Sequence, residues 1–200
     1  MRNAELTNFT GTELISRQEA KDYLKVDFTE DDNYIDQLIE IARVQVLRDT
    51  AQVVVKQSFI EKFRFWGKID NSIPVRSNFL TLKYFGKVVT TSADKIAVQY
   101  YNGSNVLTTL TEDTDYRVIE NMGLIKIEFI NTFNLYDRLD AIKVKYTLVP
   151  EADSIKPLRI AMLMLIQHYY DNRSPITYLR VNEMPLGYKS IITQYKNYIW

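Results

Sequence analysis

The spacing of apolar residues predicts helices near the start of the chain. The segment SRQE has the form of a capping box, in which the Ser16 hydroxyl accepts a backbone N–H and Glu19 reaches back. A longer helix is predicted within 28–51, with Thr29 or Asp31 as its N-cap and acidic residues in its first turn. The apolar face of this helix consists of Ile35, Leu38, Ile39, Ala42, Val46 and Leu47.

From residue 52 the pattern changes to the alternation that is typical of β-strands. The segment QVVVKQSFIEKFRFW, at 52–66, is rich in β-branched and aromatic residues and places aromatic side chains on both faces of a strand. Shorter strands are predicted in IPV and FLTLKYF. The turn residues NGS and NMG each lie between two alternating segments, so each predicts an antiparallel hairpin. A last strand, at 140–149, places Ile142, Val144 and Tyr146 opposite Lys143, Lys145 and Thr147.

Helical spacing returns after Pro150 and continues to the end of the chain. The segment DSIKPLRIAMLMLIQHYY has Asp153 or Ser154 as its N-cap and is apolar nearly all round, so we expect a central, buried helix. It should end before Pro175, because the residue that precedes a proline avoids helical backbone angles. A final helix is predicted in PLGYKSIITQYKNYIW, with an apolar side of Ile191, Ile192, Tyr195 and Ile199.

The order of helices, strands and helices predicts an α+β protein. We expect residues 14–51 and 150–200 to form a small helical bundle, and residues 52–149 to form a β-rich insertion that is sandwich-like or barrel-like. Residues 1–13 show neither period, and we interpret them as a flexible or docking arm. A chain of 200 residues is long enough to bury a substantial core.

Composition narrows the possible classes of function. Lysine plus arginine total 25 and aspartate plus glutamate also total 25, so the basic excess of proteins that bind nucleic-acid phosphates is absent. The absence of cysteine excludes disulfides and thiolate metal sites. The 14 tyrosines favour surfaces that become protein interfaces. Neither a secretory signal nor a long apolar run is present, so we expect a soluble protein that is synthesised in a cytoplasm.

The single histidine and two groups of acids are the candidates for chemistry. His168 has no evident partner for acid–base catalysis or metal binding, so we interpret it as a residue at the end of a helix. Asp32, Asp36 and Glu40 recur every four residues, and a solvated helix face explains them better than a metal or proton site. The acids of TEDTDY, at 111–116, lack the spacing of a calcium loop and predict a turn before a strand. Phosphate-binding glycine loops and nucleophile motifs are missing, so we expect no enzymatic activity and no cofactor.

Three stretches of the sequence carry a resemblance to one known family. The first is LISRQEAKDYLKVDFTEDDNYIDQLIEIARVQV, and the second is DTDYRVIENMGLIKIEF. The third is VPEADSIKPLRIAMLMLIQHYYDNRSP followed by MPLGYKSIITQY, in which Tyr170 comes just before Asn172 and Arg173. Together they resemble the head–tail connector proteins of tailed bacteriophages, which are also called adaptor or head-completion proteins. The resemblance extends over most of residues 14–196 and fits least well at 67–110.

The resemblance implies an architectural function in the virion. Connector subunits of this family form a ring, as a rule a dodecamer, beneath the portal protein in the neck between head and tail. Such a ring extends the DNA channel and receives the next neck or tail protein, while DNA passes through without sequence-specific binding. The resemblance implies no enzymatic activity, no cofactor or metal and no membrane. It also implies synthesis in the cytoplasm of a bacterial host.

Two sets of residues are candidates for roles in such a ring. A terminal tryptophan beside other apolar residues is costly to leave in water, so we expect the C-terminal segment to bind the portal or a neighbouring subunit. This set comprises Arg173, Tyr178, Tyr195, Tyr198, Ile199 and Trp200. Acidic residues that face the channel would repel DNA and let it slide. This second set comprises Glu30, Asp31, Asp32, Glu112, Asp113 and Asp115.

Two other functions fit the sequence. One is another ring or stopper protein of the phage neck or tail, with a similar build. The other is a non-enzymatic β-sandwich module that binds sugars or peptides, which the aromatic residues of the predicted strands would allow.

Overall fold

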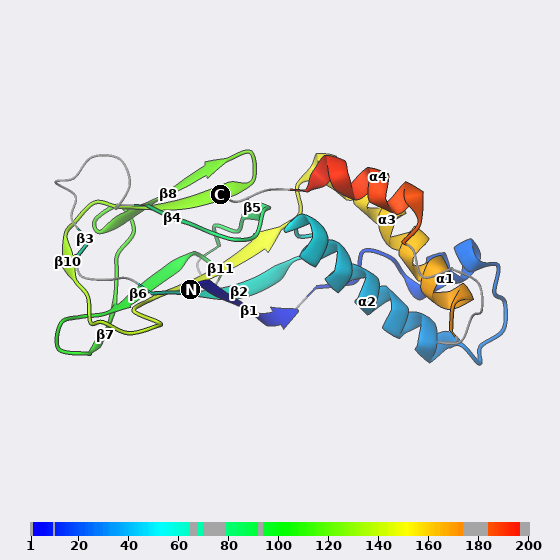
Figure 1. Ribbon diagram of the computed structural model, residues 1–200, viewed down its shortest axis with the longest axis horizontal. Coiled ribbons are helices and arrows are strands. Elements are labelled where there is room, and N and C mark those ends of the chain that lie inside the picture. Colours follow the sequence, from blue (N-terminus) through cyan, green and yellow to red (C-terminus); the bar gives the residue numbers. More distant parts are fainter. Residues whose placement is uncertain are drawn as a thin grey trace. The chain divides into compact units, whose positions relative to one another are not determined.

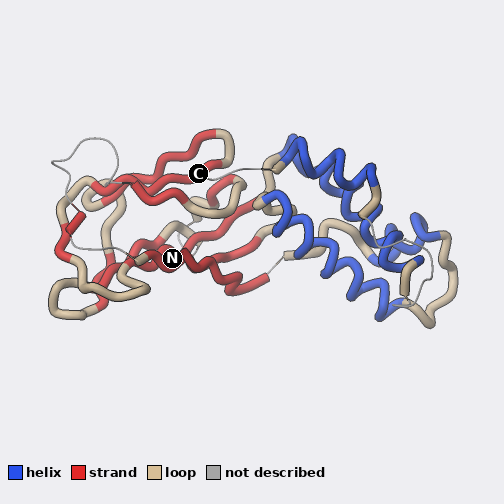
Figure 2. The backbone as a smooth tube through the Cα atoms, in the orientation of Figure 1, coloured by secondary structure: helices blue, strands red, loops and turns tan. Residues whose placement is uncertain are grey.

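The chain divides into two compact units, one built from strands and one from helices (Figures 1 and 2). The computed structural model describes residues 2–9, 11–64, 68–69, 79–91, 94–173 and 184–196. The β unit comprises residues 1–11 and 56–149, and the helical unit comprises residues 12–55 and 150–200. The chain is therefore an α+β protein with helices at both ends and antiparallel strands between them, which confirms the predicted fold class.

The helical unit places helices from both ends of the chain around one core. In the part of the chain that the structure describes, its helices are α1 (Arg17–Leu24), α2 (Asp32–Thr50), α3 (Ala152–Asp171) and α4 (Leu186–Tyr195). α2 and α3 run antiparallel, because Tyr34 near the start of α2 contacts Tyr170 near the end of α3 (Figure 1). The shared core includes Ile35, Leu38, Ala42, Val46, Leu158, Ala161, Met162, Leu165, Tyr188 and Ile192.

The N-termini of the helices differ in part from the sequence-based predictions. The Ser16 hydroxyl accepts the Glu19 backbone N–H at 3.2 Å as predicted, but the Glu19 carboxylate pairs with Arg159 of α3. Asp31 occupies the N-cap position of α2 without a side-chain capping bond, since its carboxylate is bound by Tyr170 and Arg173.

The third helix, which was expected to be central and buried, is buried along only part of its surface. α3 is buried along one face, through Ser154, Leu158, Ala161, Met162, Leu165 and Ile166. Its opposite side is open, and Ile160 there is 49% exposed. The helix begins at Ala152 after Glu151, so neither Asp153 nor Ser154 is its N-cap, and it ends at Asp171 as expected.

The β unit contains antiparallel sheets of different sizes. The largest has the order β1 (Arg2–Phe9), β2 (Gln57–Phe63), β11 (Ile142–Val149), β6 (Ala97–Tyr101) and β7 (Leu107–Thr109), and β5 (Lys87–Val88) also pairs with β11. A three-stranded sheet consists of β4 (Phe79–Thr81), β9 (Leu124–Phe129) and β8 (Tyr116–Asn121). A short pair is formed by β10 (Phe133–Asn134) and β3 (Lys68–Ile69).

The predicted flexible arm is wrong for most of its length. Residues Arg2–Phe9 form β1, which pairs with β2 from Arg2 opposite Phe63 to Phe9 opposite Gln57. An edge strand is held mainly by backbone hydrogen bonds, which any sequence except proline can supply. The segment RNAELTNF therefore needs no clear alternation to become a strand.

Both predicted hairpins are confirmed, and the strand predicted at 52–66 is confirmed at 57–63. The turn between β8 and β9 consists of Met122 and Gly123, whose positive φ angles of 49° and 75° fit the twist of a two-residue hairpin loop. β2 is shorter than expected, and its buried face alternates through Gln57, Phe59, Glu61 and Phe63. The strand predicted in IPV, at 73–75, lies outside the described residues.

An aromatic cluster forms the centre of the β unit. The Phe59 ring stacks on Tyr84 at 4.2 Å and on Tyr146 at 5.4 Å between ring centroids. The buried carboxylate of Glu61 accepts hydrogen bonds from the Tyr146 hydroxyl and, at 2.6 Å, from the Lys83 backbone N–H. Because a buried charge is costly unless it is hydrogen-bonded, these donors fix the position of Glu61 within the core.

Candidate functional site

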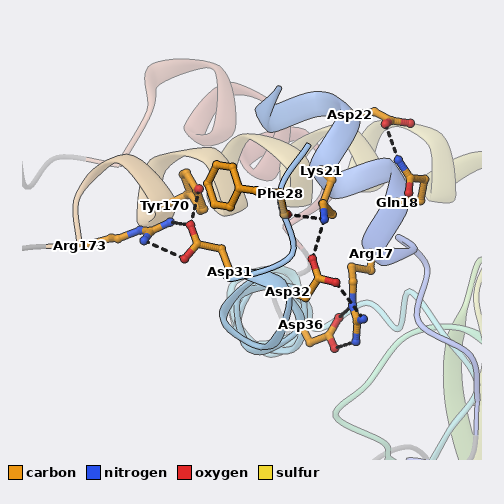
Figure 3. A network of polar contacts seen from close by, with 10 residues as sticks. All are labelled: Arg17, Gln18, Lys21, Asp22, Phe28, Asp31, Asp32, Asp36, Tyr170 and Arg173. Atoms are coloured by element: carbon orange, nitrogen blue, oxygen red, sulfur yellow. Dashed lines mark hydrogen bonds and ion pairs between the residues drawn. The ribbon is translucent and has the colours of Figure 1, made fainter. Parts of the chain in front are cut away.

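A network of charged and aromatic side chains joins α1, the start of α2 and the end of α3 (Figure 3). The sequence contributes three acids to it over a short distance, Asp31, Asp32 and Asp36. Their cationic partners come from α1 and from the residues that follow α3. The network therefore connects segments that lie far apart in the chain.

Arg173 fastens the end of α3 to the start of α2. Its two terminal nitrogens reach both carboxylate oxygens of Asp31, at 3.2 Å for Nη1 and Oδ1. Its guanidinium group lies 4.0 Å from the Tyr170 ring centroid and 4.7 Å from that of Tyr34. The Tyr170 hydroxyl donates to the same Asp31 carboxylate at 2.6 Å. A planar guanidinium group suits both contacts, since it can bond a carboxylate with two nitrogens while it stacks on aromatic rings.

The other half of the network fastens α1 to α2. Lys21 is 7% exposed, and its ammonium group donates to Asp32 Oδ1 and to the Phe28 carbonyl oxygen, each at 2.6 Å. Arg17 pairs with both carboxylate oxygens of Asp36, with Nε to Oδ1 at 2.9 Å. It also reaches Asp32 at 3.4 Å. The contacts of Lys21 offset the free-energy cost of burying its ammonium group.

This geometry changes the interpretation of the first acidic set, which consists of Glu30, Asp31, Asp32 and Asp36 near the start of α2. The sequence suggested that Asp32 and Asp36 belong to a solvated helix face, but both pair with cations of α1. Asp31 is likewise paired, with Arg173. Glu30 of the same set is exposed. Helical spacing could not reveal this, because the partners lie outside the i, i+3 and i, i+4 neighbours of one helix.

The second acidic set, which consists of Glu112, Asp113 and Asp115, forms the predicted turn before β8. Asp115 accepts the Thr111 backbone N–H at 2.8 Å and the Asn131 side-chain amide at 3.0 Å, which shapes the turn. Glu112 pairs with Lys95 at 2.7 Å. Asp113 is exposed and has a φ of 64°. This set belongs to the β unit, and the first set belongs to the helical unit.

The proposed C-terminal interface set lies only partly within the described residues. Tyr195 ends α4, is half-buried, and its carbonyl oxygen accepts a hydrogen bond from the Gln52 side chain at 3.2 Å. Arg173 forms an ion pair with Asp31, which belongs to the same unit. Tyr178, Tyr198, Ile199 and Trp200 lie outside the described residues.

His168 has the helix-end position that the sequence predicted. It lies in the last turn of α3, where the Asn172 side-chain amide donates to its carbonyl oxygen at 2.7 Å and lies 3.4 Å from its Nδ1 atom. It lines a shallow surface pocket with Met164, Gln167, Asp171, Asn172, Pro185 and Gly187. Over the described ranges, no group of three or more histidine, aspartate or glutamate side chains could hold a metal ion. In the same ranges, every helix is too short or too polar to cross a membrane.

Comparisons with known proteins give matches at the level of structure. No protein-family model matches the sequence, and a search of curated proteins finds no significant match. The fold is similar to a chain from the neck of an empty GTA particle computed with C6 symmetry, with a TM-score of 0.68 and 16% identity over 99% of this chain and 97% of that chain. It is also similar to a chain from the neck of a native GTA particle computed with C12 symmetry, with a TM-score of 0.66 and 19% identity over 100% and 97%.

A third similar chain comes from the virion of a native gene transfer agent (GTA) particle. Its TM-score is 0.65 and its identity 15%, over 98% of this chain and 96% of that chain. These comparisons show a fold that is shared over nearly the full length of both chains, including the helical unit and the β unit. The identity between the sequences is low, at 15% to 19%.

Asp31 and Asp36 predict a pH dependence of stability. Hydrogen bonds from Arg173 and Tyr170 lower the pKa of Asp31, and a hydrogen bond from Arg17 lowers the pKa of Asp36. Such a carboxylate stabilises the fold above its unfolded pKa of about 3.9, and this contribution is lost as the pH falls through the lower, folded pKa. We expect the unfolding temperature, measured by circular dichroism, to fall between about pH 5 and about pH 2, and to fall less in an Asp31→Asn, Asp36→Asn double variant.

The control for this prediction is Asp171→Asn. Asp171 is exposed at the end of α3. Its variant should keep the wild-type dependence of unfolding temperature on pH. If the double variant also keeps the wild-type dependence, the two ion pairs do not stabilise the helical unit.

Proposed function

We propose that the protein is a ring-forming head–tail connector in the neck of a phage-like particle. In this proposal, copies of the chain form a closed ring, of twelve subunits, beneath the portal protein. The ring extends the DNA channel and receives the next neck or tail component. Its function is structural, without enzymatic activity, and DNA passes through it without sequence-specific binding.

The observation that carries this proposal is the full-length structural similarity to chains from GTA necks. Helical bundles and small β-sheets are each common, so a match to one unit alone would say little about function. Here a single chain from each particle matches both units in the same order. The neck structures were computed with C6 and C12 symmetry, and cyclic symmetry is the arrangement that the proposal requires.

The composition of the chain is in keeping with a protein that assembles with further copies. The chain has no net charge, so little long-range repulsion opposes the approach of further copies. Its 14 tyrosines supply amphipathic side chains of the kind that is enriched in protein interfaces.

Native mass spectrometry tests the proposal directly. The purified chain should be measured alone and after mixing with the portal protein that the same genome encodes. We expect a ring-sized species, with the mass of twelve subunits, in at least one of the two samples. A monomer in both samples, at concentrations well above micromolar, would contradict the proposal and favour a free-standing binding module.

The C-terminal residues give a second prediction. A chain that ends after Lys196 loses Tyr198, Ile199 and Trp200 but keeps the hydrogen bond between Gln52 and Tyr195. We therefore expect it to fold with an unchanged circular dichroism spectrum and to lose binding to the portal protein or to neighbouring subunits. Ring formation and portal binding at the wild-type level would show that this segment is not part of the interface.

The exposed acids give a third prediction. Asp31 and Asp32 are paired within the helical unit, so Glu30 and Asp113 are the members of the two acidic sets to reverse. If they face the channel, Glu30→Lys and Asp113→Lys should bind DNA phosphates and slow the release of DNA from assembled particles. Asp171→Lys is an exposed control outside both sets. Unchanged release in both test variants would remove these acids from the channel.

A further inference from the structure

β7 forms one edge of the largest sheet of the β unit (Figure 1). Within the described residues, it pairs with β6 alone, in an antiparallel ladder. Backbone bonds continue this ladder beyond both ends of the strand. The Asn102 N–H donates to the Val106 carbonyl oxygen at 3.0 Å, and the Leu110 N–H donates to the Val98 carbonyl oxygen at 2.9 Å. The edge that is bonded to β6 therefore extends over residues 106–110.

The ladder leaves backbone groups of β7 directed away from the sheet. In an antiparallel pair, residues that exchange both backbone bonds with the neighbouring strand alternate with residues whose N–H and C=O point away from it. Val106 and Leu110 bond to β6, so Leu107 and Thr109, at the alternate positions, direct both groups outward. No other strand of the described part of the chain pairs with them. The edge thus presents donors and acceptors in the pattern that a further strand would meet.

β7 lacks the features that usually keep a sheet edge from binding another strand. Such edges are normally interrupted by charges, by proline or by a bulge. The segment NVLTTLT, at 105–111, contains no charge, proline or glycine and is rich in β-branched residues. The edge strand β1, by contrast, contains Arg2 and Glu5 and has a bulge. The edge strand β8 contains Arg117 and Glu120. Of these three edges, β7 is therefore the one that is open to a further strand.

Exposed apolar side chains lie along this edge. Val106 is 56% exposed and Leu107 is 42% exposed. They are consecutive in an extended chain, so their side chains lie on opposite faces of the sheet. A strand that adds to β7 would therefore cover apolar surface on both faces, in addition to bonding the backbone.

The edge is held in place by its own unit. The Asn102 side-chain oxygen accepts the backbone N–H groups of Ser104 and Val106, each at 3.0 Å, which shapes the turn before β7. From a neighbouring loop, Arg138 donates to the Asn105 side-chain oxygen at 3.0 Å. A preformed edge lowers the entropy that is lost when a partner binds.

We propose that an extended segment of another neck protein adds to β7 as a further strand of this sheet. The backbone of that segment bonds the outward groups of Leu107 and Thr109, and its apolar side chains cover Val106 and Leu107. The inference rests on the proposed function, because the occupant is a component of the same particle.

Symmetry argues against a second copy of the chain as the occupant. Two β7 edges that pair with each other would form an isologous contact, which relates two copies by a two-fold axis and closes as a dimer. A cyclic ring is built from heterologous contacts instead. At the opposite edge of the same sheet, β1 carries charges and a bulge. A strand from a different protein avoids both difficulties.

Hydrogen exchange measures the proposed pairing directly. The purified chain should be mixed in turn with the portal protein and with each further neck protein that the same genome encodes. In the chain alone, the amides of Leu107 and Thr109 should exchange rapidly. In the complex with one of these proteins, their exchange should slow by at least ~10-fold. Equal exchange in every mixture would overturn the proposal. Protection in the chain alone would overturn it too, because a second copy would then cover the edge.

A proline substitution tests the backbone contact. Thr109→Pro removes an N–H that points away from β6, so it should keep the circular dichroism spectrum and lower the affinity for the partner by about tenfold. Thr109→Val is the matched control. Both variants lose the hydrogen bond from the Gln99 side chain to the Thr109 hydroxyl, at 3.1 Å, but only proline removes the backbone N–H. Thr109→Val should bind like the wild type. Equal affinities of the two variants would contradict strand addition.

A charge at the edge gives a test that leaves every backbone group in place. Leu107→Asp should fold, because Leu107 is exposed, and should weaken binding of the partner, because the added strand would cover the new carboxylate. Ser104→Asp adds the same charge on the exposed turn before β7 and should bind like the wild type. Wild-type affinity of the Leu107→Asp chain would show that β7 is not covered in the complex.

The wild-type sample separates a failure of this inference from a failure of the proposed function. If the wild type forms rings and the amides of Leu107 and Thr109 stay unprotected in every mixture, strand addition is wrong and the connector function stands. If the wild type forms no ring with or without the portal protein, the connector function fails. Protection of both amides by one of the neck proteins would in that case still support strand addition at β7.

Discussion

The antiparallel packing of α2 against α3 is the constraint on which the rest of the structure depends. These helices lie on opposite sides of the β unit in the sequence, and together they supply most of the core of the helical unit. Neither is stable alone in water, because each needs a partner for its apolar face. The β unit therefore connects two halves of a single core, and the helical unit forms only when both halves are present.

The contacts of Asp31 determine how this packing ends. Asp31 precedes α2, and its carboxylate holds Tyr170 and Arg173 at the end of α3, 139 and 142 residues away. Arg173 lies over the rings of Tyr34 and Tyr170, so its guanidinium group contacts aromatic rings as well as a carboxylate. Together with Lys21 and Asp32, this arrangement fixes the chain direction at one end of the helical unit without a buried charge that lacks a partner.

Ion pairs within the helical unit also determine which side chains remain on its outer surface. Arg17, Lys21 and Arg173 are used within the helical unit, and so are the acids that bind them. The outer faces of α2 and α3 combine exposed isoleucine and valine with a few charges at the borders.

The sequence by itself determined the features that depend on neighbours along the chain. The helical spacing of apolar residues predicted α2 and its buried face. The capping residue Ser16 predicted the start of α1, and the turn residues Met122 and Gly123 predicted the hairpin of β8 and β9. These predictions succeed because backbone angles, and the face of a helix or strand that is buried, depend on residues within about one helical turn or one hairpin. The α+β class followed from the order of such segments.

Only the tertiary structure decided the partners that are distant in sequence. It made a strand of Arg2–Phe9, because β2 offered an unpaired edge. It paired Asp31 and Asp36 with arginines of other segments, where the sequence showed only a run of acids. It also left Ile160 exposed on a helix whose composition predicted a central, buried position. Hydrogen bonds, ion pairs and burial depend on which groups folding brings together, and local spacing along the chain carries no information about that choice.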